Sequence, residues 1–142
     1  MSSQVPPPSV IHLPENLDTQ REVERRRVLV VDDEHLITDT ICLILNQSGF
    51  EAAAAYNGEE AMEAAAKLRP GIVLSDVLMP RMSGVELGIR LHKECPATRV
   101  ILLSGQTGTS EIIQQAEAHG YFFDLFPKPI RPQDLIARLK AI

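Results

Sequence analysis

Short apolar runs alternate with amphipathic segments along most of the chain. The runs at 27–31, 72–75 and 99–103 consist mainly of Val, Ile and Leu, a composition typical of strands that are buried on both faces. Residues 121–126 predict a further strand, and so do residues 50–56, where the position between two helices outweighs the helical preference of alanine. Segments with helical spacing complete the pattern, at 35–49, 57–71, 83–94, 110–120 and 132–142.

Helix start and stop signals support these boundaries. Asn57 precedes Glu60 by three residues, and Ser83 stands in the same relation to Glu86. This spacing is that of a capping box, which begins a helix. Gly49 follows the first helical segment and suits the left-handed position that ends many helices. The strands and helices are therefore predicted to be separate elements joined by short turns.

Strands that alternate with helices predict a parallel sheet, because a crossover of a dozen or more residues is needed to join strands that run in the same direction. Helices cover both faces of such a sheet, so the chain is predicted to form a doubly wound α/β domain with a five-stranded parallel sheet. In open sheets of this kind, ligands bind beyond the carboxyl ends of the strands. The residues that follow each strand are therefore the strongest candidates for function.

The composition excludes several classes of protein. A chain of 142 residues is long enough for one domain with a substantial core. Its net charge of −5 does not favour direct nucleic-acid binding. No apolar run approaches the roughly 18 residues of a membrane span, and the first residues lack the pattern of a secretory signal. We therefore expect a cytoplasmic protein without membrane contact.

The first 24 residues differ from the rest of the chain, because they contain the run VPPP and many polar side chains. We predict that residues 1–24 form a disordered or loosely helical extension and that residues 25–142 form the domain. Cys42 and Cys95 match no metal-binding spacing. A reducing compartment favours two free thiols over a disulfide between them.

Polar residues follow four of the predicted strands. Asp32 and Asp33 follow the first strand, Asp76 the third, Ser104 the fourth and Lys128 the fifth. Clustered carboxylates repel one another unless cations offset them, and Lys128 supplies one positive charge. Mg²⁺ can supply the rest, because it binds a few carboxylates together with waters and leaves room for phosphate oxygens. These groups can neutralise a phosphoryl group in transfer, and a carboxylate can itself accept that group.

Each of these residues also has an ordinary structural interpretation. Asp32 and Asp33 could cap the helix that follows them. Ser104 and Gly105 could form a generic turn, and a single exposed lysine carries little information. The functional interpretation rests on the fact that all of these residues stand at the ends of the correct strands. Chance is a poor explanation for that joint placement.

Four segments carry a resemblance to a known family: VLVVDDE at 28–34, LSDVLMPRMSG at 74–84, ILLSG at 101–105 and PKP at 127–129. Together they resemble the receiver domain of bacterial two-component response regulators. The resemblance covers about residues 26 to 142 and fills the signature positions in order. It implies a flavodoxin-like fold with strand order 2-1-3-4-5. It also implies a phosphoacceptor switch rather than an enzyme, with at most slow self-dephosphorylation.

The resemblance assigns roles to individual residues. It implies that Asp76 accepts a phosphoryl group from a phosphohistidine of a sensor histidine kinase or phosphotransfer protein. Ser104 matches the hydroxyl residue that bonds the phosphoryl group, and Lys128 matches the lysine that pairs with it. An output domain or partner protein is implied but not identified, and a homodimer is one possible assembly. The implied Mg²⁺ ligands are Asp33, directly, together with Asp32, Asp76 and the backbone carbonyl of Leu78.

Two other functions are compatible with this fold. A pseudo-receiver would use it as an interaction module without phosphorylation, and the complete set of acceptor, metal-binding, hydroxyl and lysine residues argues against that function. A hydrolase that works through an aspartyl phosphate needs a second acid, commonly two residues after the nucleophile. This chain has Leu78 at that position. A phosphoacceptor switch is therefore the leading hypothesis.

Two positions depart from the family pattern. Gly105 stands where alanine is frequent, and Leu125 stands three residues before the lysine, where Tyr or Phe is common. In most receivers a ring at the latter position moves inward when the hydroxyl turns toward the phosphate, so we expect a weak response of the surface formed by the fourth helix, fifth strand and fifth helix. Phe123 is the alternative ring, because regular alternation places it on the face of Leu125 and places Phe122 and Phe126 on the other.

Overall fold

The computed structural model describes residues 22–105 and 109–142. Most of the extension predicted for residues 1–24 lies outside the described residues, while residues 22–26 are helical and lead directly into the first strand. Strands and helices then alternate in this order: β1 (Arg27–Val31), α3 (His35–Gln47), β2 (Glu51–Ala55), α4 (Gly58–Leu68), β3 (Ile72–Asp76), α5 (Gly84–Glu94), β4 (Arg99–Ser104), α6 (Thr109–Ala118), β5 (Asp124–Pro127) and α7 (Pro132–Lys140).

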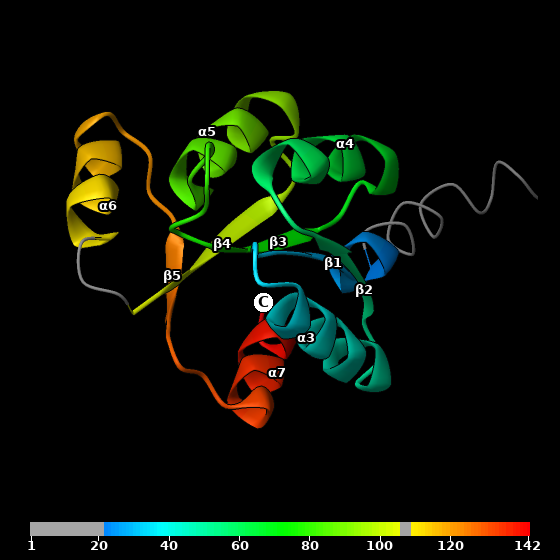
Figure 1. Ribbon diagram of the computed structural model, residues 1–142. Helices are drawn as coiled ribbons and strands as arrows, with labels where there is room; N and C mark the ends of the chain where they lie inside the picture. The colour runs from blue at the N-terminus through cyan, green and yellow to red at the C-terminus, as the bar shows by residue number, and fades with distance from the viewer. Residues whose placement is uncertain (1–21, 106–108) are drawn as a thin grey trace, which may run out of the picture.

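The strands form one parallel sheet in the order β2-β1-β3-β4-β5. This arrangement confirms the predicted doubly wound α/β fold and its strand order. Helices α3 and α7 cover one face of the sheet, and α4, α5 and α6 cover the other (Figure 1). Because every strand runs in the same direction, the carboxyl ends of all five lie at one edge.

The core lies on both faces of the sheet, as the internal strand β1 shows. Val28 and Val30 join the apolar cluster formed with α3 and α7, whereas Leu29 and Val31 join the cluster formed with α4 and α5. Burial on both faces explains why the sequence of β1 is an unbroken apolar run after its first residue. In the described part of the chain, no helix combines the length and the apolar character that crossing a bilayer requires.

The predicted starts of α4 and α5 and the predicted stop at Gly49 are confirmed by their caps. The Asn57 side chain accepts a hydrogen bond from the backbone N–H of Glu60, and the Ser83 side chain accepts one from Glu86. Gly49 lies just beyond α3 in a left-handed conformation, with φ of 96°. The caps fix where α4 and α5 begin, and therefore how the preceding loops leave the carboxyl edge of the sheet.

The fifth strand is shorter than predicted and begins at Asp124 rather than at Tyr121. The cause is the end of α6, where Gly120 is left-handed with φ of 89°. The Tyr121 N–H donates to the Ala116 carbonyl, and the Gly120 N–H donates to the Glu117 carbonyl. This pair of bonds is a Schellman motif, which uses the Tyr121 backbone to close the helix instead of to start the strand.

The alternation predicted for residues 121–126 is therefore wrong for the residues before Asp124. Phe122 precedes the strand and is 75% exposed, whereas Phe126 is buried within it. The ring of Phe123 lies against α5 at Gly88, where an added Cβ atom would approach the ring to 2.6 Å. Phe123 thus packs with the cluster between α5 and α6, and it does not occupy the strand position that alternation predicted.

Both cysteines are free thiols, as predicted. Cys42 is buried on α3, where burial raises the pKa of its thiol to about 11, and nearby Asp39 adds to this shift. Cys95 follows α5 and is only partly buried. The thiolate is the reactive form of cysteine, so the two residues are expected to react at different rates.

We expect an aromatic disulfide reagent at mildly alkaline pH to modify Cys95 at least about tenfold faster than Cys42 in the folded protein. The physical reason is the raised pKa of Cys42, which leaves little thiolate at that site. Absorbance of the released thiolate measures both rates, and Cys95→Ser should leave only the slow phase. Two equally fast phases in the folded protein would contradict the burial of Cys42.

Candidate functional site

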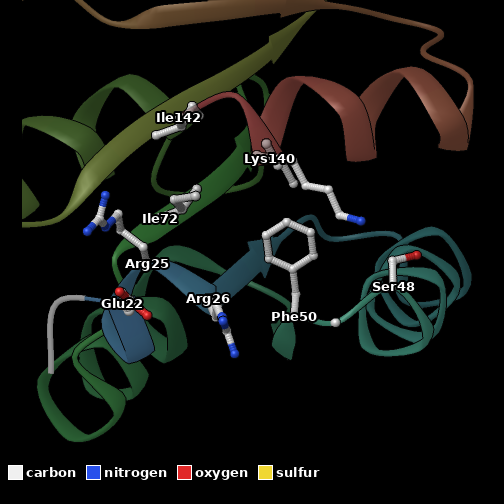
Figure 2. Close-up of a pocket in the computed structure, with 10 residues that line it drawn as sticks. Glu22, Arg25, Arg26, Ser48, Phe50, Ile72, Lys140 and Ile142 are labelled. Carbon is white, nitrogen blue, oxygen red and sulfur yellow. The ribbon is translucent and has the colours of Figure 1, made fainter. Parts of the chain in front are cut away.

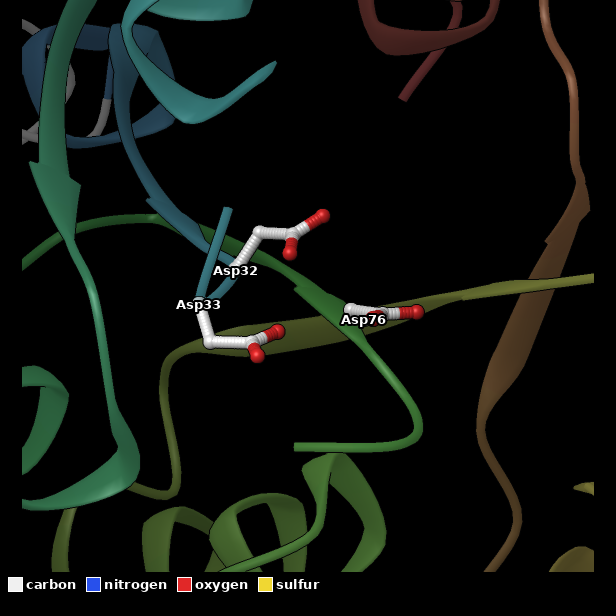
Figure 3. A group of neighbouring side chains, drawn as sticks. All are labelled: Asp32, Asp33 and Asp76. Carbon is white, nitrogen blue, oxygen red and sulfur yellow. The ribbon is translucent and has the colours of Figure 1, made fainter. Parts of the chain in front are cut away.

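The carboxyl ends of β1 and β3 lie side by side, and each carries an aspartate. Val31 pairs with Ser75 in the parallel register. Asp32, the next residue of the chain, therefore lies beside Asp76, the last residue of β3. Asp33 follows in the loop after β1. Figure 3 shows that all three aspartates project from these two strand ends toward a common space.

The three carboxylates are close enough to repel one another. One oxygen from each of Asp32, Asp33 and Asp76 lies within 4.8 Å of the others. The repulsion is weakly screened, because Asp32 is buried and the Asp76 side chain is only 13% exposed. The arrangement therefore requires positive charge nearby.

Lys128 supplies one such charge from the other side of β4. Its Nζ lies 2.9 Å from Asp76 Oδ1 and 3.8 Å from Asp32 Oδ2. The Lys128 residue follows β5 directly, and its backbone N–H donates to the Ser104 carbonyl at 3.1 Å. From that anchored position the long side chain reaches past the end of β4 to the aspartates.

The individual carboxylate oxygens have different environments. Asp76 Oδ1 accepts hydrogen bonds from Lys128 Nζ and, at 3.0 Å, from the Val77 N–H, whereas no hydrogen bond among the described residues reaches Asp76 Oδ2. Asp32 Oδ1 accepts from the Glu34 N–H at 3.0 Å. Asp32 Oδ2 is buried and has no hydrogen-bond partner within residues 22–105 and 109–142. One oxygen of each residue is therefore available to a further ligand.

Burial raises the pKa of Asp32 above its ordinary value of 3.8. The hydrogen bond from the Glu34 N–H and the charge of Lys128 lower the pKa and oppose this rise. The negative charges of Asp76 and Asp33 add to it. Because the net direction is upward, ionising Asp32 costs free energy in the folded protein. A divalent cation beside Asp32 Oδ2 would offset that cost.

The set of oxygen donors fits a hard divalent cation. The carboxylates of Asp32, Asp33 and Asp76 are the ligand type that Mg²⁺ prefers, and a few such ligands completed by water is its usual arrangement. The Leu78 carbonyl, two residues beyond Asp76, accepts no backbone hydrogen bond from the described residues. Among the described residues, the ligands that the sequence resemblance implies thus include one buried oxygen without a hydrogen-bond donor and one carbonyl without a backbone donor.

Ser104 ends β4, between the strands that carry Asp76 and Lys128. Its hydroxyl shares a hydrogen bond of 3.1 Å with the Thr109 hydroxyl, in which either oxygen can donate. No hydrogen bond within the described part of the chain joins the Ser104 hydroxyl to Asp76 or Lys128. The structure therefore brings the aspartates and the lysine together, and it places Ser104 beside them with its hydroxyl bonded to α6.

The departure from the family pattern at Gly105 has a steric explanation. A Cβ atom at this position would lie 2.5 Å from the Lys128 carbonyl oxygen and 2.8 Å from the Lys128 Cβ atom. Both distances are shorter than non-bonded contacts allow, so a larger residue would displace the segment that carries the lysine. Glycine at this position lets Lys128 pack closely against the end of β4.

Two groups at this site were not found from the sequence. Thr109 lies outside the helix predicted at 110–120, yet it is the first residue of α6, is buried and bonds to Ser104. A threonine just before a helical pattern is a common helix-start signal, so its position was detectable but its partner was not. The Val77 N–H that holds Asp76 belongs to the backbone and leaves no signal in the sequence.

A cavity of about 290 Å³ lies at the opposite edge of the sheet, beside the start of β3 (Figure 2). Phe50 and Ile72 contribute apolar surface to it, and Arg26 and Lys140 line it with positive charge. This edge holds the amino ends of the strands, whereas ligands of open parallel sheets bind at the carboxyl ends. The acidic cluster is therefore the candidate functional site.

The strand order and the polar groups at the strand ends define a class of protein, the doubly wound domain with an acidic site at the carboxyl ends of its strands. The model of one family, the response regulator receiver domain, matches residues 28–140. The chain belongs to this family. It is therefore a receiver domain of two-component signal transduction, and such domains are generally signalling modules rather than enzymes.

Several relatives show how far the similarity extends. The chain is 31% identical over 117 residues to the DNA-binding response regulator MtrA of Mycobacterium tuberculosis, covering 82% of this chain and 50% of that protein. It thus spans about half the length of the curated relatives that it matches. Chemotaxis protein CheY4 of Vibrio cholerae superposes with a TM-score of 0.71 at 30% identity, over 82% of this chain and 97% of that one. A receiver domain from Clostridium thermocellum gives a TM-score of 0.71 at 28% identity, over 81% and 91%.

Asp32→Asn is expected to stabilise the metal-free protein at neutral pH, because a neutral amide replaces a buried ionised carboxylate. A carboxyl group whose pKa is raised on folding stabilises the folded protein when the pH is below the pKa of the unfolded chain, here 3.8. That contribution is lost as the pH rises through the raised pKa of the folded protein. The gain should therefore be largest at neutral pH and small near pH 4. A gain on the order of 1 kcal/mol would raise Tm by roughly 3–6 °C in EDTA.

Glu63→Gln is the matched control, because Glu63 is exposed on α4 and lies outside the acidic cluster. It should leave Tm within about 1 °C of the wild-type value. Adding Mg²⁺ should then stabilise the wild-type protein more than Asp32→Asn. A lower Tm for Asp32→Asn than for wild type, in EDTA at neutral pH, would contradict the cost assigned to the buried carboxylate.

Proposed function

We propose that this chain is a phosphoacceptor switch, in which Asp76 takes a phosphoryl group from a sensor histidine kinase or phosphotransfer protein in a Mg²⁺-dependent reaction. The observation that carries the proposal is the contact of 2.9 Å between Lys128 Nζ and Asp76 Oδ1 within the acidic cluster. This contact neutralises part of the charge and engages one oxygen of the acceptor. It leaves Asp76 Oδ2 as the oxygen that reacts.

In the proposed step, Asp76 Oδ2 attacks the phosphorus of a phosphohistidine. An O–P bond forms, the P–N bond breaks, and the leaving imidazole nitrogen takes up a proton from solvent. Lys128 and the Val77 N–H hold Oδ1, which fixes the orientation of the carboxylate while Oδ2 reacts. Ser104, at the end of the neighbouring strand, then donates a hydrogen bond from its hydroxyl to an oxygen of the attached phosphoryl group.

The residues proposed to hold Mg²⁺ are Asp33, Asp32 and Asp76 with the backbone carbonyl of Leu78. When bound, the ion supplies positive charge to the phosphoryl oxygens. The buried Oδ2 of Asp32, which has no hydrogen-bond donor in the described part of the chain, supports this assignment. Asp33 is exposed in the loop after β1 and offers its carboxylate from the solvent side.

The same residues favour a switch over rapid turnover. Hydrolysis of an aspartyl phosphate requires a group that activates water. The side chain two residues beyond the acceptor, where such hydrolases commonly carry an acid, is the aliphatic Leu78. We therefore propose at most slow self-dephosphorylation. A pseudo-receiver would not take up a phosphoryl group, so the phosphorylation experiment below distinguishes it from the switch.

The wider role follows from this switch. The relative MtrA is named a DNA-binding response regulator, and this chain covers half of its length. We propose that the present domain makes no direct contact with nucleic acid or membrane, in agreement with its net charge of −5. It would act in the cytoplasm on an output domain or separate protein, and a homodimer is one form in which it could do so.

Acetyl phosphate with Mg²⁺ should add one phosphoryl group, about 80 Da, to the wild-type protein. Asp76→Asn should abolish the gain, because an amide is a poor nucleophile, and EDTA should abolish it for the wild type. Intact-mass spectrometry measures both effects. Asp134→Asn is the matched control, since Asp134 lies on α7 outside the cluster. Undiminished phosphorylation of Asp76→Asn would remove Asp76 as the acceptor, and no gain for the wild type would favour the pseudo-receiver.

Asp33→Ala should weaken Mg²⁺ binding at least about tenfold, and Asp32→Ala should weaken it less. A cation held by few protein oxygens depends on each of them, and the resemblance assigns direct contact to Asp33. Titration calorimetry measures the affinity. Glu34→Ala is the control, because Glu34 is the next carboxylate in the chain and is not part of the cluster. Equal Mg²⁺ affinity in wild type and Asp33→Ala would rule out the proposed metal site.

A further inference from the structure

The hydroxyl of Ser104 is held by a buried partner. Its oxygen lies 3.1 Å from the Thr109 hydroxyl oxygen, and Thr109, the first residue of α6, is only 4% exposed. The bond joins the carboxyl end of β4 to the start of the next helix. Because the Thr109 hydroxyl is buried, water does not easily replace it as the partner of Ser104, and the bond favours one orientation of the Ser104 side chain.

The orientation that Thr109 favours differs from the one that phosphorylation requires. A hydroxyl has one proton to donate, and phosphoryl oxygens only accept, so Ser104 must direct its O–H toward Asp76. Asp76 lies on β3, where it pairs with Leu103 in the register, whereas Thr109 lies on α6. The Ser104 hydroxyl bonds to Thr109 and makes no hydrogen bond to the Asp76 carboxylate within the described residues. Where Ser104 is the donor of this bond, its O–H has to turn from Thr109 to the phosphoryl group.

We propose that Thr109 is a positioning residue, which holds the Ser104 hydroxyl away from the phosphoryl site in the unphosphorylated protein. The inference rests on the proposed phosphoacceptor function. When Ser104 turns to the phosphoryl group, the first turn of α6 loses its bond to β4. Thr109 thus competes with the phosphoryl group for Ser104, and it disfavours the phosphorylated state.

This connection to α6 does not require a ring on β5. Leu125 is aliphatic and partly exposed, and the Phe123 ring is packed against α5 at Gly88. Phe123 would have to leave that contact in order to move inward. The bond between Ser104 and Thr109 joins β4 to the helix directly, so an exchange of hydroxyl partners reaches α6 without an aromatic side chain.

Beryllofluoride with Mg²⁺ provides the test, because it binds an aspartate and mimics the phosphoryl group. Thr109→Val keeps the shape of the side chain and removes the hydroxyl. Without the competing bond, Thr109→Val should bind beryllofluoride roughly 3- to 10-fold more tightly than wild type, the range expected for one hydrogen bond. Thr109→Ser restores a hydroxyl and should return the affinity to the wild-type value. Titration calorimetry measures all three.

A double-mutant cycle separates competition from a general change in stability. In a Ser104→Ala background there is no hydroxyl for Thr109 to hold. Thr109→Val should then leave the beryllofluoride affinity unchanged. An effect of equal size in both backgrounds would overturn the proposal, and so would weaker binding by Thr109→Val in the presence of Ser104.

The inference and the function on which it rests fail in different ways. If beryllofluoride does not bind the wild type in an Asp76-dependent manner, both are overturned. If the wild type binds and Thr109→Val has the same affinity, only the role of Thr109 is overturned.

A second variant covers the case in which Thr109→Val does not fold. In Ser104→Ala, the Ile113 amide should exchange its hydrogen several-fold faster than in wild type, because its acceptor in a regular helix is the carbonyl of Thr109. An unchanged exchange rate at Ile113 would overturn the proposal.

Discussion

Repulsion among three carboxylates at the carboxyl edge of the sheet is the constraint on which the rest of the site depends. The parallel register of β1 and β3 makes Asp32 and Asp76 neighbours. Among the described residues, Lys128 is the cation that forms ion pairs with both of them. Lys128 reaches them because Gly105 leaves space for its backbone at the end of β4. The sheet topology, the charge balance and the glycine are thus parts of one arrangement.

Most of the fold could be predicted from the sequence, because it depends on local patterns. Buried strands such as β1 are unbroken apolar runs, and the caps at Asn57 and Ser83 involve residues only three positions apart. Once the strands are known to be parallel, the polar residues that follow them must meet at one edge. The grouping of Asp32, Asp33 and Asp76 therefore follows from topology, without any knowledge of contacts.

The features that could not be predicted depend on competition between neighbouring segments or on contacts between distant ones. β5 begins at Asp124 rather than at Tyr121 because the backbone N–H groups of Gly120 and Tyr121 bond to carbonyls at the end of α6. Phe123 is held at α5 by the space that Gly88 leaves, and these two residues are far apart in the sequence. The bond between Ser104 and Thr109 depends on how the chain turns after β4. None of these contacts leaves a pattern in residue spacing.

The strength of a hydroxyl pair limits how much Thr109 can influence the proposed switch. One hydrogen bond contributes about 0.5–1.5 kcal/mol net, whereas moving a two-state equilibrium from 1:99 to 99:1 takes roughly 5.5 kcal/mol. In the proposed switch, most of the difference between states must therefore come from contacts that the phosphoryl group makes with Lys128 and with a cation held by the acidic cluster, since only such differential contacts shift populations. In the proposed switch, Lys128 and the bound cation would supply the driving force, and the bond between Ser104 and Thr109 would set how much of it is needed before α6 responds.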